Sequence, residues 1–436
     1  MSELERGRNP RRVSVDLVAP AARAADNICR RLDAGQSYRP WFWVEGRDGV
    51  PVAVEHRSWD FGDMTGRYLE ALVRVRTMAG PRARWSRAEE RLRVYLAALY
   101  GPNGLVMDTD RGEPDHVFSQ GSALYGLVAD LEDGRRPETL ALLERQVSGL
   151  VGWGHWRDDM CTWPELATAV SPCTCMAGYL ITPLVRLYEL TNHAGALRLA
   201  AGIARWVLRE HDALGPDGEI RHPGWDGHLH AWQDTLAGLI QCSRHADVGA
   251  PRNDVVALCR RVYGWIRATH ATTSGWVADS VGALTSETCA IASSIRLALE
   301  LAREGHADVL PDVARAMANQ LPHQQFGDVS PLGITDPLVA DVVRDSFDSH
   351  ATPASLLMEQ QGGIEGCCTN GGVRGLWLVW SSPLRDALIT LLADGNERET
   401  EEMAGGTRYR IFWHGDVVVA VEPSGGRYPI PWSAVA

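Results

Sequence analysis

Apolar residues recur at helical spacing along most of the chain. Between Met176 and Leu208 they fall three or four positions apart on both sides of the short segment Thr191-Asn192-His193. This spacing places them on one face of a helix, so we predict two antiparallel helices, 176–190 and 194–208, joined by a turn. The same pattern predicts an apolar helical stripe from residue 69 and helices near 20–32, 91–100, 122–131, 138–150, 230–242, 253–269, 289–303, 308–320 and 368–380.

About a dozen helices paired as antiparallel hairpins favour an (α/α)6 barrel, in which the hairpins close into a ring around a central cleft. The end of the chain differs in pattern. Residues 407–413 and 417–422 are rich in β-branched and aromatic residues and flank His414-Gly415-Asp416, which predicts a β-hairpin. We therefore expect a mainly α fold with a helical barrel over residues 1–383 and a linker with a small β-rich tail over 384–436.

Composition narrows the classes of function. The formal net charge is -12, which argues against nucleic acid or an anionic membrane as a partner. The first residues lead into no long apolar stretch, so we expect neither a signal peptide nor a membrane span, and a cytoplasmic location. The nine cysteines lack the spacing of a disulfide scaffold, so we expect reduced thiols.

Two short runs carry candidate chemistry. Cys367 and Cys368 are adjacent in a glycine-rich segment, and Glu287 precedes Cys289 by two positions in the other run. Three thiolates and one carboxylate form a suitable tetrahedral ligand set for zinc. Glu287 and Cys289 can share one ion only where the chain is extended or turning, because residues two apart point to different sides of a helix.

A metal-held thiolate is also deprotonated at neutral pH, so the same cluster can supply a nucleophile. The alternative is that these cysteines are buried thiols that behave as small apolar side chains. Cys173 and Cys175 form a competing pair, but no second pair of ligands lies nearby in the sequence, which favours a structural role for them.

A second group of side chains suits sugar binding. His228 and His230 stand at an expected helix start between Trp225 and Trp232. Imidazole can hydrogen-bond hydroxyl groups, and indole can stack on the apolar face of a sugar. The alternative is that the histidines cap the helix or are satisfied within the core.

These motifs resemble those of a known family. Ser286-Glu287-Thr288-Cys289-Ala290 and Glu365-Gly366-Cys367-Cys368-Thr369-Asn370 are similar to the two zinc motifs of the β-L-arabinofuranosidases of glycoside hydrolase family 127. That family consists of retaining, zinc-dependent cysteine glycosidases on an (α/α)6 barrel with β-domains. Weaker similarities occur at Gly178-Tyr179-Leu180-Ile181 and at Gly227-His228, and the resemblance spans roughly residues 60–380.

The resemblance implies a role for each of these residues. The zinc ligands would be Glu287, Cys289, Cys367 and Cys368, and Cys367 would attack the sugar to form a thioglycosyl intermediate. His228 would contact the substrate, and Tyr179 stands in place of a family histidine. Independently of the resemblance, the chemistry of the histidine and tryptophan cluster adds His230 and Trp232 to the expected substrate contacts.

The chain also departs from the family. The β-sandwich that follows the cysteine pair is nearly missing, and the family's acid/base glutamate has no counterpart before Glu287. Asp279 is the nearest carboxylate in that region, so we expect it to act as the acid/base. Glu165 is a second candidate without positional support, and a solvated loop aspartate is the alternative for Asp279.

The sequence therefore predicts a retaining, zinc-dependent glycoside hydrolase for a small carbohydrate or glycoside, with a β-L-arabinofuranoside as the first candidate. Two alternatives remain open at this level. One is a sugar-binding or structural zinc protein that has lost catalysis, and the other is a different (α/α)6 carbohydrate enzyme such as an epimerase or a lyase.

Overall fold

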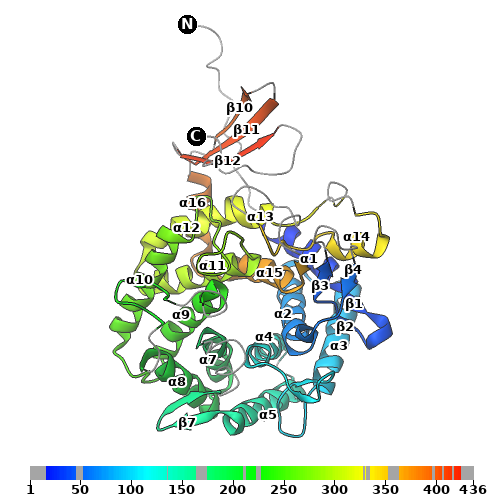
Figure 1. Ribbon diagram of the computed structural model, residues 1–436, viewed down its shortest axis with the longest axis vertical. Helices are drawn as coiled ribbons and strands as arrows, with labels where there is room; N and C mark the ends of the chain where they lie inside the picture. The colour runs from blue at the N-terminus through cyan, green and yellow to red at the C-terminus, as the bar shows by residue number, and fades with distance from the viewer. Residues whose placement is uncertain are drawn as a thin grey trace.

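The computed structural model describes residues 16–45, 53–134, 136–163, 174–209, 213–221, 227–327, 329, 334–351, 363–394, 398–404, 407–414 and 417–423. Helices dominate these residues and form two concentric rings (Figure 1). The chain folds as an (α/α)6 barrel, as the hydrophobic pattern predicts.

Six helices form the inner ring. Each contacts the next, and the last contacts the first, so the ring is closed. In order, they are α2 (Gly62–Ala79), α4 (Val117–Gly134), α7 (Ile181–Thr191), α9 (Leu229–Ser243), α11 (Thr288–Arg303) and α15 (Cys367–Trp380). Since each inner helix is followed by a chain segment that returns along the outside, the inner helices run in the same direction. Their N-terminal ends therefore meet at one end of the barrel.

The outer ring pairs with the inner one. Its members are α1 (Val18–Arg30), α3 (Ala83–Ala98), α5 (Pro137–Trp153), α8 (Ala194–Arg209), α10 (Arg252–Thr269) and α12 (Leu310–Arg315). Helix α1 packs against both α2 and α15, so the start of the chain covers the seam where the ring closes.

The two rings differ in how their residues are buried. Helix α10 buries one stripe at helical spacing, from Val255 through Cys259 and Val262 to Ile266, as expected for a helix with one face in solvent. Helix α4 instead buries every residue from Val117 to Leu131, because it is covered on all sides. The burial patterns therefore match the positions of the two helices, α4 in the inner ring and α10 in the outer ring.

Glycines allow α2 and α4 to approach closely. A Cβ on Gly66 would lie 2.2 Å from the carbonyl oxygen of Ser122, and a Cβ on Gly126 would lie 2.4 Å from the carbonyl oxygen of Gly66. Backbone therefore packs directly on backbone at this crossing, and no side chain fits between the two helices.

Two helices are less regular than the sequence predicts. The expected helix 176–190 is divided into α6 (Thr174–Gly178) and α7 by a turn at Tyr179 and Leu180. The expected helix 308–320 consists of α12 followed by a π-helical turn, η7 (Ala316–Gln320). The remaining helical segments are η2 (Ala34–Gln36), η3 (Ser58–Asp60), η6 (Ala307–Val309), α13 (Leu321–His323), α14 (Pro337–Val343) and α16 (Arg385–Asp394).

Strands are few and short. The three-stranded sheet β4-β3-β9 joins β3 (Trp43–Glu45) and β4 (Ala53–Glu55) to β9 (Ile364–Glu365), with Trp43 opposite Glu365. This pairing ties the N-terminal region to the residues just before Cys367. Two-stranded pairs are formed by β1 (Leu32–Asp33) with β2 (Arg39–Pro40), β5 (Met107–Asp108) with β6 (Glu113–Pro114), and β7 (His155–Arg157) with β8 (Met160–Thr162).

The predicted C-terminal hairpin is present and has one more strand than expected. Strands β11 (Thr407–His414) and β12 (Val417–Pro423) pair antiparallel, and β10 (Arg398–Ala404) adds to the other edge of β11. This small sheet lies outside the ring, beyond α16 (Figure 1). Helix α16 itself packs against α12 and α15. The domain boundary at residues 383 and 384 stays a prediction.

A cavity of about 310 Å³ lies at the C-terminal ends of the inner helices. Its lining includes the ion pairs Arg374–Glu70, Arg74–Glu132 and Arg244–Glu300. Because the cysteines lie at the opposite, N-terminal ends of α11 and α15, this cavity is separate from the candidate site described below.

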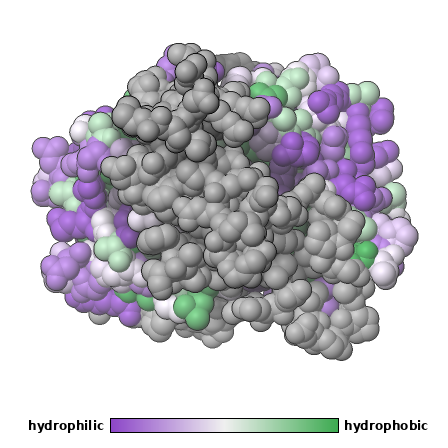
Figure 2. Space-filling model, turned by 90° about the horizontal axis from the view of Figure 1, so that it is seen from above, coloured by the Kyte–Doolittle hydropathy of each residue, from purple (hydrophilic) through white to green (hydrophobic). Residues whose placement is uncertain are grey.

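None of the helices in the described segments combines the length and apolarity needed to cross a bilayer. On the face shown in Figure 2 the coloured residues are mainly hydrophilic, and apolar residues are scattered among them, which is ordinary for a protein surface.

Candidate metal centre and active site

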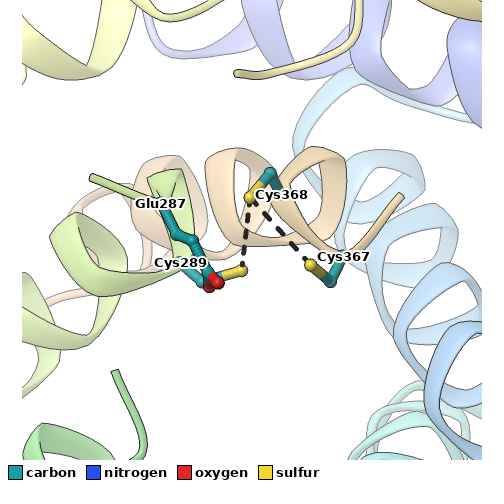
Figure 3. A group of neighbouring side chains, drawn as sticks. All are labelled: Glu287, Cys289, Cys367 and Cys368. Atoms are coloured by element: carbon teal, nitrogen blue, oxygen red, sulfur yellow. Dashed lines mark hydrogen bonds between the residues drawn. The ribbon is translucent and has the colours of Figure 1, made fainter. Parts of the chain in front are cut away.

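The two cysteine-containing runs meet at the N-terminal ends of two neighbouring inner helices. Glu287 is the N-cap residue of α11 and has an extended backbone (φ -84°, ψ 142°), while Cys289 lies in the first turn of that helix. Cys367 and Cys368 are the first two residues of α15. The four side chains point toward one another (Figure 3), and their ligand atoms all lie within 4.8 Å of one another. The extended conformation at Glu287 is what lets residues two apart share one site.

The spacing of the sulfurs fits a tetrahedral metal. The Sγ atoms of Cys289 and Cys368 are 4.0 Å apart, as are those of Cys367 and Cys368. Zinc–sulfur bonds of about 2.3 Å in a tetrahedron put two sulfurs about 3.8 Å apart. All three cysteines are buried, and Glu287 is partly open to solvent. This buried, sulfur-rich set therefore matches the preference of zinc, and Glu287 stands on its open side.

The three thiols are not equivalent. Sulfur–sulfur hydrogen bonds with Cys367 and Cys368 hold the pKa of the Cys289 thiol well below its ordinary value. The contact with Cys289 raises the pKa of Cys367, and burial raises the pKa of Cys368. The three thiols therefore titrate as one coupled set, in which a thiolate on one sulfur is stabilised by the other two.

A buried arginine reaches that sulfur. Arg67, on α2, is 1% exposed, and its Nη1 lies 3.9 Å from Cys289 Sγ. The Arg67 Nε donates to Asp63 Oδ1 at 2.6 Å, and Nη2 lies 3.4 Å from His230 Nε2. The sequence analysis did not identify Arg67. The available signal was an Asp–Arg pair four positions apart on a helix that carries several other charged residues, so the pair did not stand out.

A second carboxylate lies beside the cysteine pair. Glu365 Oε2 is 3.4 Å from Cys367 Sγ, because β9 pairs with β3 and ends immediately before α15. Burial and the nearby charge of Glu287 raise the pKa of Glu365 to about 8. Glu365 belongs to the motif that the sequence analysis recognised, but no role was predicted for it.

The two predicted histidines occupy different depths. His228 is the N-cap residue of α9, and its Nε2 lies 3.6 Å from Glu287 Oε2. His230 is 2% exposed, and its Nδ1 is 2.7 Å from Ser293 Oγ. Burial holds the pKa of His230 well below its usual range. His228 therefore adjoins the metal ligands directly, and His230 lies behind them beside Arg67.

Tyr179 and Trp232 belong to the core near this cluster. Tyr179 is 0% exposed, and its hydroxyl accepts a hydrogen bond of 2.9 Å from Arg374 Nη1. Its ring meets that of His230 edge to face, with 5.6 Å between centroids. Trp232 is 1% exposed. Side chains this deeply buried present almost no surface to a ligand in this conformation.

Asp279 lies in the same region as Glu287. Its Oδ2 accepts a hydrogen bond of 3.0 Å from Thr285 Oγ1, and its carbonyl oxygen accepts one of 2.6 Å from the Leu229 N–H. Burial, reinforced by the charge of Glu287, raises the pKa of Asp279 to about 6. A carboxyl group with this pKa holds its proton in about a tenth of molecules at pH 7, far more often than an ordinary aspartate does, and this favours a role as general acid.

One further histidine faces the site. His350 lies edge-on to Trp43, with 6.4 Å between ring centroids, and the Glu287 charge acts on it. Neither ring nitrogen has a hydrogen-bond partner among the described residues. The sequence analysis did not identify His350, because nothing in its local sequence resembles a motif. Glu165, Cys173 and Trp225 lie outside the described residues, as does the side chain of Cys175.

Comparison with known proteins identifies the fold. No protein-family model and no curated protein sequence matches the chain. A solved structure of a GH127 β-arabinofuranosidase is similar, with a TM-score of 0.53 and 11% identity over 90% of this chain and 61% of that one. A GH76 α-mannanase from Bacteroides thetaiotaomicron has a TM-score of 0.56 and 10% identity over 86% and 97% of the two chains. The unsaturated glucuronyl hydrolase of Bacillus sp. GL1 has a TM-score of 0.57 and 12% identity over 84% and 97%.

These likenesses establish the (α/α)6 barrel. By their names, all three similar structures are carbohydrate hydrolases, and they represent three different kinds of hydrolase. The chain spans 61% of the length of the GH127 enzyme, in keeping with the small β-region after the barrel. The identity is too low to assign the chain to one group.

Proposed function

We propose that this protein is a retaining glycoside hydrolase that uses a zinc-bound cysteine as its nucleophile. The observation that carries the proposal is the cluster of Glu287, Cys289, Cys367 and Cys368 at the N-terminal end of the inner ring. Supporting it are the glycosidic enzymes with the same fold and the resemblance of both ligand motifs to those of family 127.

Zinc is the metal that the four residues suit best, because three sulfurs and one oxygen form a tetrahedral set of soft and borderline donors. When bound, the metal would keep the thiols deprotonated at neutral pH. Cys289 and Cys368 would serve as ligands throughout the reaction, while Cys367 would act both as a ligand and as the nucleophile.

The reaction would proceed in two displacements. The Cys367 sulfur attacks the anomeric carbon, and the leaving oxygen takes the proton of Asp279 as its bond to that carbon breaks. Water then attacks the same carbon from the opposite side, Asp279 takes a proton from it, and the carbon–sulfur bond breaks. Two inversions give net retention of configuration.

The substrate would be a small neutral glycoside, with a β-L-arabinofuranoside as the first candidate. His228 would hydrogen-bond a sugar hydroxyl beside Glu287, since its Nε2 is already within 3.6 Å of that carboxylate. Three buried side chains would support the site without touching the sugar, by packing behind His228: His230, Tyr179 and Trp232.

Metal analysis of the purified protein and a screen of p-nitrophenyl glycosides test the proposal. About one zinc per chain and release of p-nitrophenol from a pentofuranoside are expected, with both lost on chelation. The nitrophenolate leaving group needs little protonation, so it reports a competent nucleophile even where acid catalysis is weak. Zinc binding without turnover of any glycoside would favour a sugar-binding or structural zinc protein instead.

A further inference from the structure

Arg67 is placed to act on the cluster from outside the ligand set. It comes from α2, whereas the ligands come from α11 and α15, and its guanidinium lies beside the adjacent rings of Phe118 and Tyr179. The distances from its central carbon to the two ring centroids are 5.3 and 5.7 Å. These rings, together with the bond from Nε to Asp63, restrict the guanidinium to one orientation.

Among the described residues, the terminal N–H groups of this guanidinium have two contacts. Nη1 lies 3.9 Å from Cys289 Sγ, and Nη2 lies 3.4 Å from His230 Nε2. His230 is itself fixed on its other side, where Nδ1 contacts Ser293 Oγ, which in turn donates to Asp234. The contact between Arg67 and Cys289 is therefore held by a rigid frame from three inner helices.

Cys367 has a different neighbour. Its sulfur lies 3.4 Å from the carboxyl oxygen Oε2 of Glu365. An N–H group from a guanidinium withdraws electron density from a thiolate, which stabilises it as a ligand and reduces its nucleophilicity. Among the described residues, the Cys367 sulfur has a hydrogen-bond contact with Glu365 and none with a guanidinium N–H. The sulfurs of Cys289 and Cys367 therefore have different hydrogen-bonding neighbours, although they belong to one cluster.

We propose that Arg67 is a positioning residue that fixes Cys289 as the permanent metal ligand and leaves Cys367 as the reactive sulfur. The inference rests on the proposed zinc centre and extends it, because it assigns the division of roles among three cysteines to a residue outside the ligand motifs. It requires no particular substrate.

Zinc affinity provides the first test. Arg67→Met should weaken zinc binding about 10- to 100-fold in competition with a chromophoric chelator, and Arg67→Lys should recover part of the loss. The double variant Asp63→Asn, Arg67→Met leaves no unpaired buried carboxylate, so it should fold even where the single variant does not, with the same weakening. The double variant Glu70→Gln, Arg374→Met is the matched control, because it also leaves no unpaired buried carboxylate. Arg374 is equally buried and pairs with Glu70 of α2, but its loss should leave zinc affinity within about threefold of wild type.

Alkylation provides a readout that a merely structural role would not change. In the zinc-loaded wild type, limiting iodoacetamide should modify Cys367 before Cys289, as read by peptide mass spectrometry. In the zinc-loaded Arg67 variants Cys289 should be modified alongside Cys367. Unchanged zinc affinity with an unchanged order of alkylation would overturn the proposal. Neither readout depends on hydrolysis, so failure of the glycosidase proposal would be seen separately, as a wild-type protein that binds zinc and turns over no glycoside.

Discussion

The sulfur atoms of Cys289 and Cys368 lie 4.0 Å apart, although 79 positions separate the two residues in the chain. They meet because α11 and α15 are neighbours in the inner ring and present their first turns at the same end. A metal at this point would cross-link two helices that otherwise depend on side-chain packing. The cluster is therefore expected to contribute to stability as well as to chemistry.

Replacement of both cysteines tests that double role. The Cys289→Ser, Cys368→Ser variant should retain no zinc, and its melting temperature should fall to that of the chelator-treated wild type, because metal binding and folding are linked. Cys259→Ser is the control. Cys259 is also fully buried, but its sulfur contacts the Leu236 carbonyl and is remote from the cluster. Full zinc occupancy in the double variant, measured by elemental analysis, would show that the assigned ligands are wrong.

Selective labelling tests the role of Cys367. A sugar bearing a haloacetamide group should modify Cys367 while zinc remains bound, and free substrate should protect it. Cys161 and Cys242 serve as internal controls, because burial raises the pKa of each thiol to about 12 and keeps it protonated. Mass spectrometry of tryptic peptides decides the outcome. Labelling spread over several cysteines would mean that the adjacent pair is only structural.

Asp279 should matter most for poor leaving groups. Asp279→Asn should reduce hydrolysis of an alkyl glycoside about 100-fold or more and that of an aryl glycoside far less, because only the former needs a proton on the leaving oxygen. Asp254→Asn, a change at an exposed aspartate of α10, is the control. Equal and small losses on both substrates would return Asp279 to the role of a loop residue.

The pH profile provides a second measurement on the same residue. The pKa of Asp279 is raised to about 6, so its acid form predominates below that pH and is lost as the pH rises through it. The rate for an alkyl glycoside should therefore fall on the alkaline side of about pH 6. In the proposed centre, zinc would offset the negative charge of Glu287. The pKa of Asp279 would then fall, and the alkaline limb of the profile would shift to lower pH. Asp279→Asn should remove the limb altogether, and a limb that survives the substitution would belong to another group.

The crossing of α2 and α4 should tolerate no added atom. Gly66→Ala places a Cβ 2.2 Å from the Ser122 carbonyl oxygen, so the helices must separate, at a cost of at least about 1–3 kcal/mol in the free energy of unfolding. Gly152 of α5 is the matched control, because a Cβ there meets nothing within 4 Å. Gly152→Ala should stabilise the protein by up to about 1 kcal/mol. Urea unfolding followed by circular dichroism measures both, and a Gly66→Ala variant as stable as wild type would contradict the close packing.

Most of the barrel could be predicted because its helices carry their pattern locally. The predicted helix 253–269 and the observed α10 (Arg252–Thr269) agree to within one residue, since one apolar stripe faces the core. Strand β10 (Arg398–Ala404) was not predicted, because its Arg-Glu-Thr-Glu-Glu run shows no alternation of apolar residues. The break at Tyr179 was also missed, since the helical spacing continues through it.

The candidate metal ligands could be proposed from the sequence because each motif places two donors within two positions of each other. Arg67, Glu365 and His350 could not be given roles in the same way. Arg67 reaches Cys289 across 222 positions, and a contact of that range depends on which helices become neighbours in the ring. Glu365 stands beside Cys367 because β9 pairs with β3, a strand more than 300 residues earlier in the chain.

The closure of the ring between α2 and α15 has a consequence for biosynthesis. The first inner helix leaves the ribosome long before the last. The side of α2 that contacts α15 therefore stays exposed until residues 367–380 have been synthesised. Cys289 likewise waits for Cys367 and Cys368, and an incomplete chain offers zinc only half of a site. For the proposed zinc centre, metal uptake would therefore be a late event in biosynthesis, and a zinc-loaded molecule would be one whose barrel has already closed.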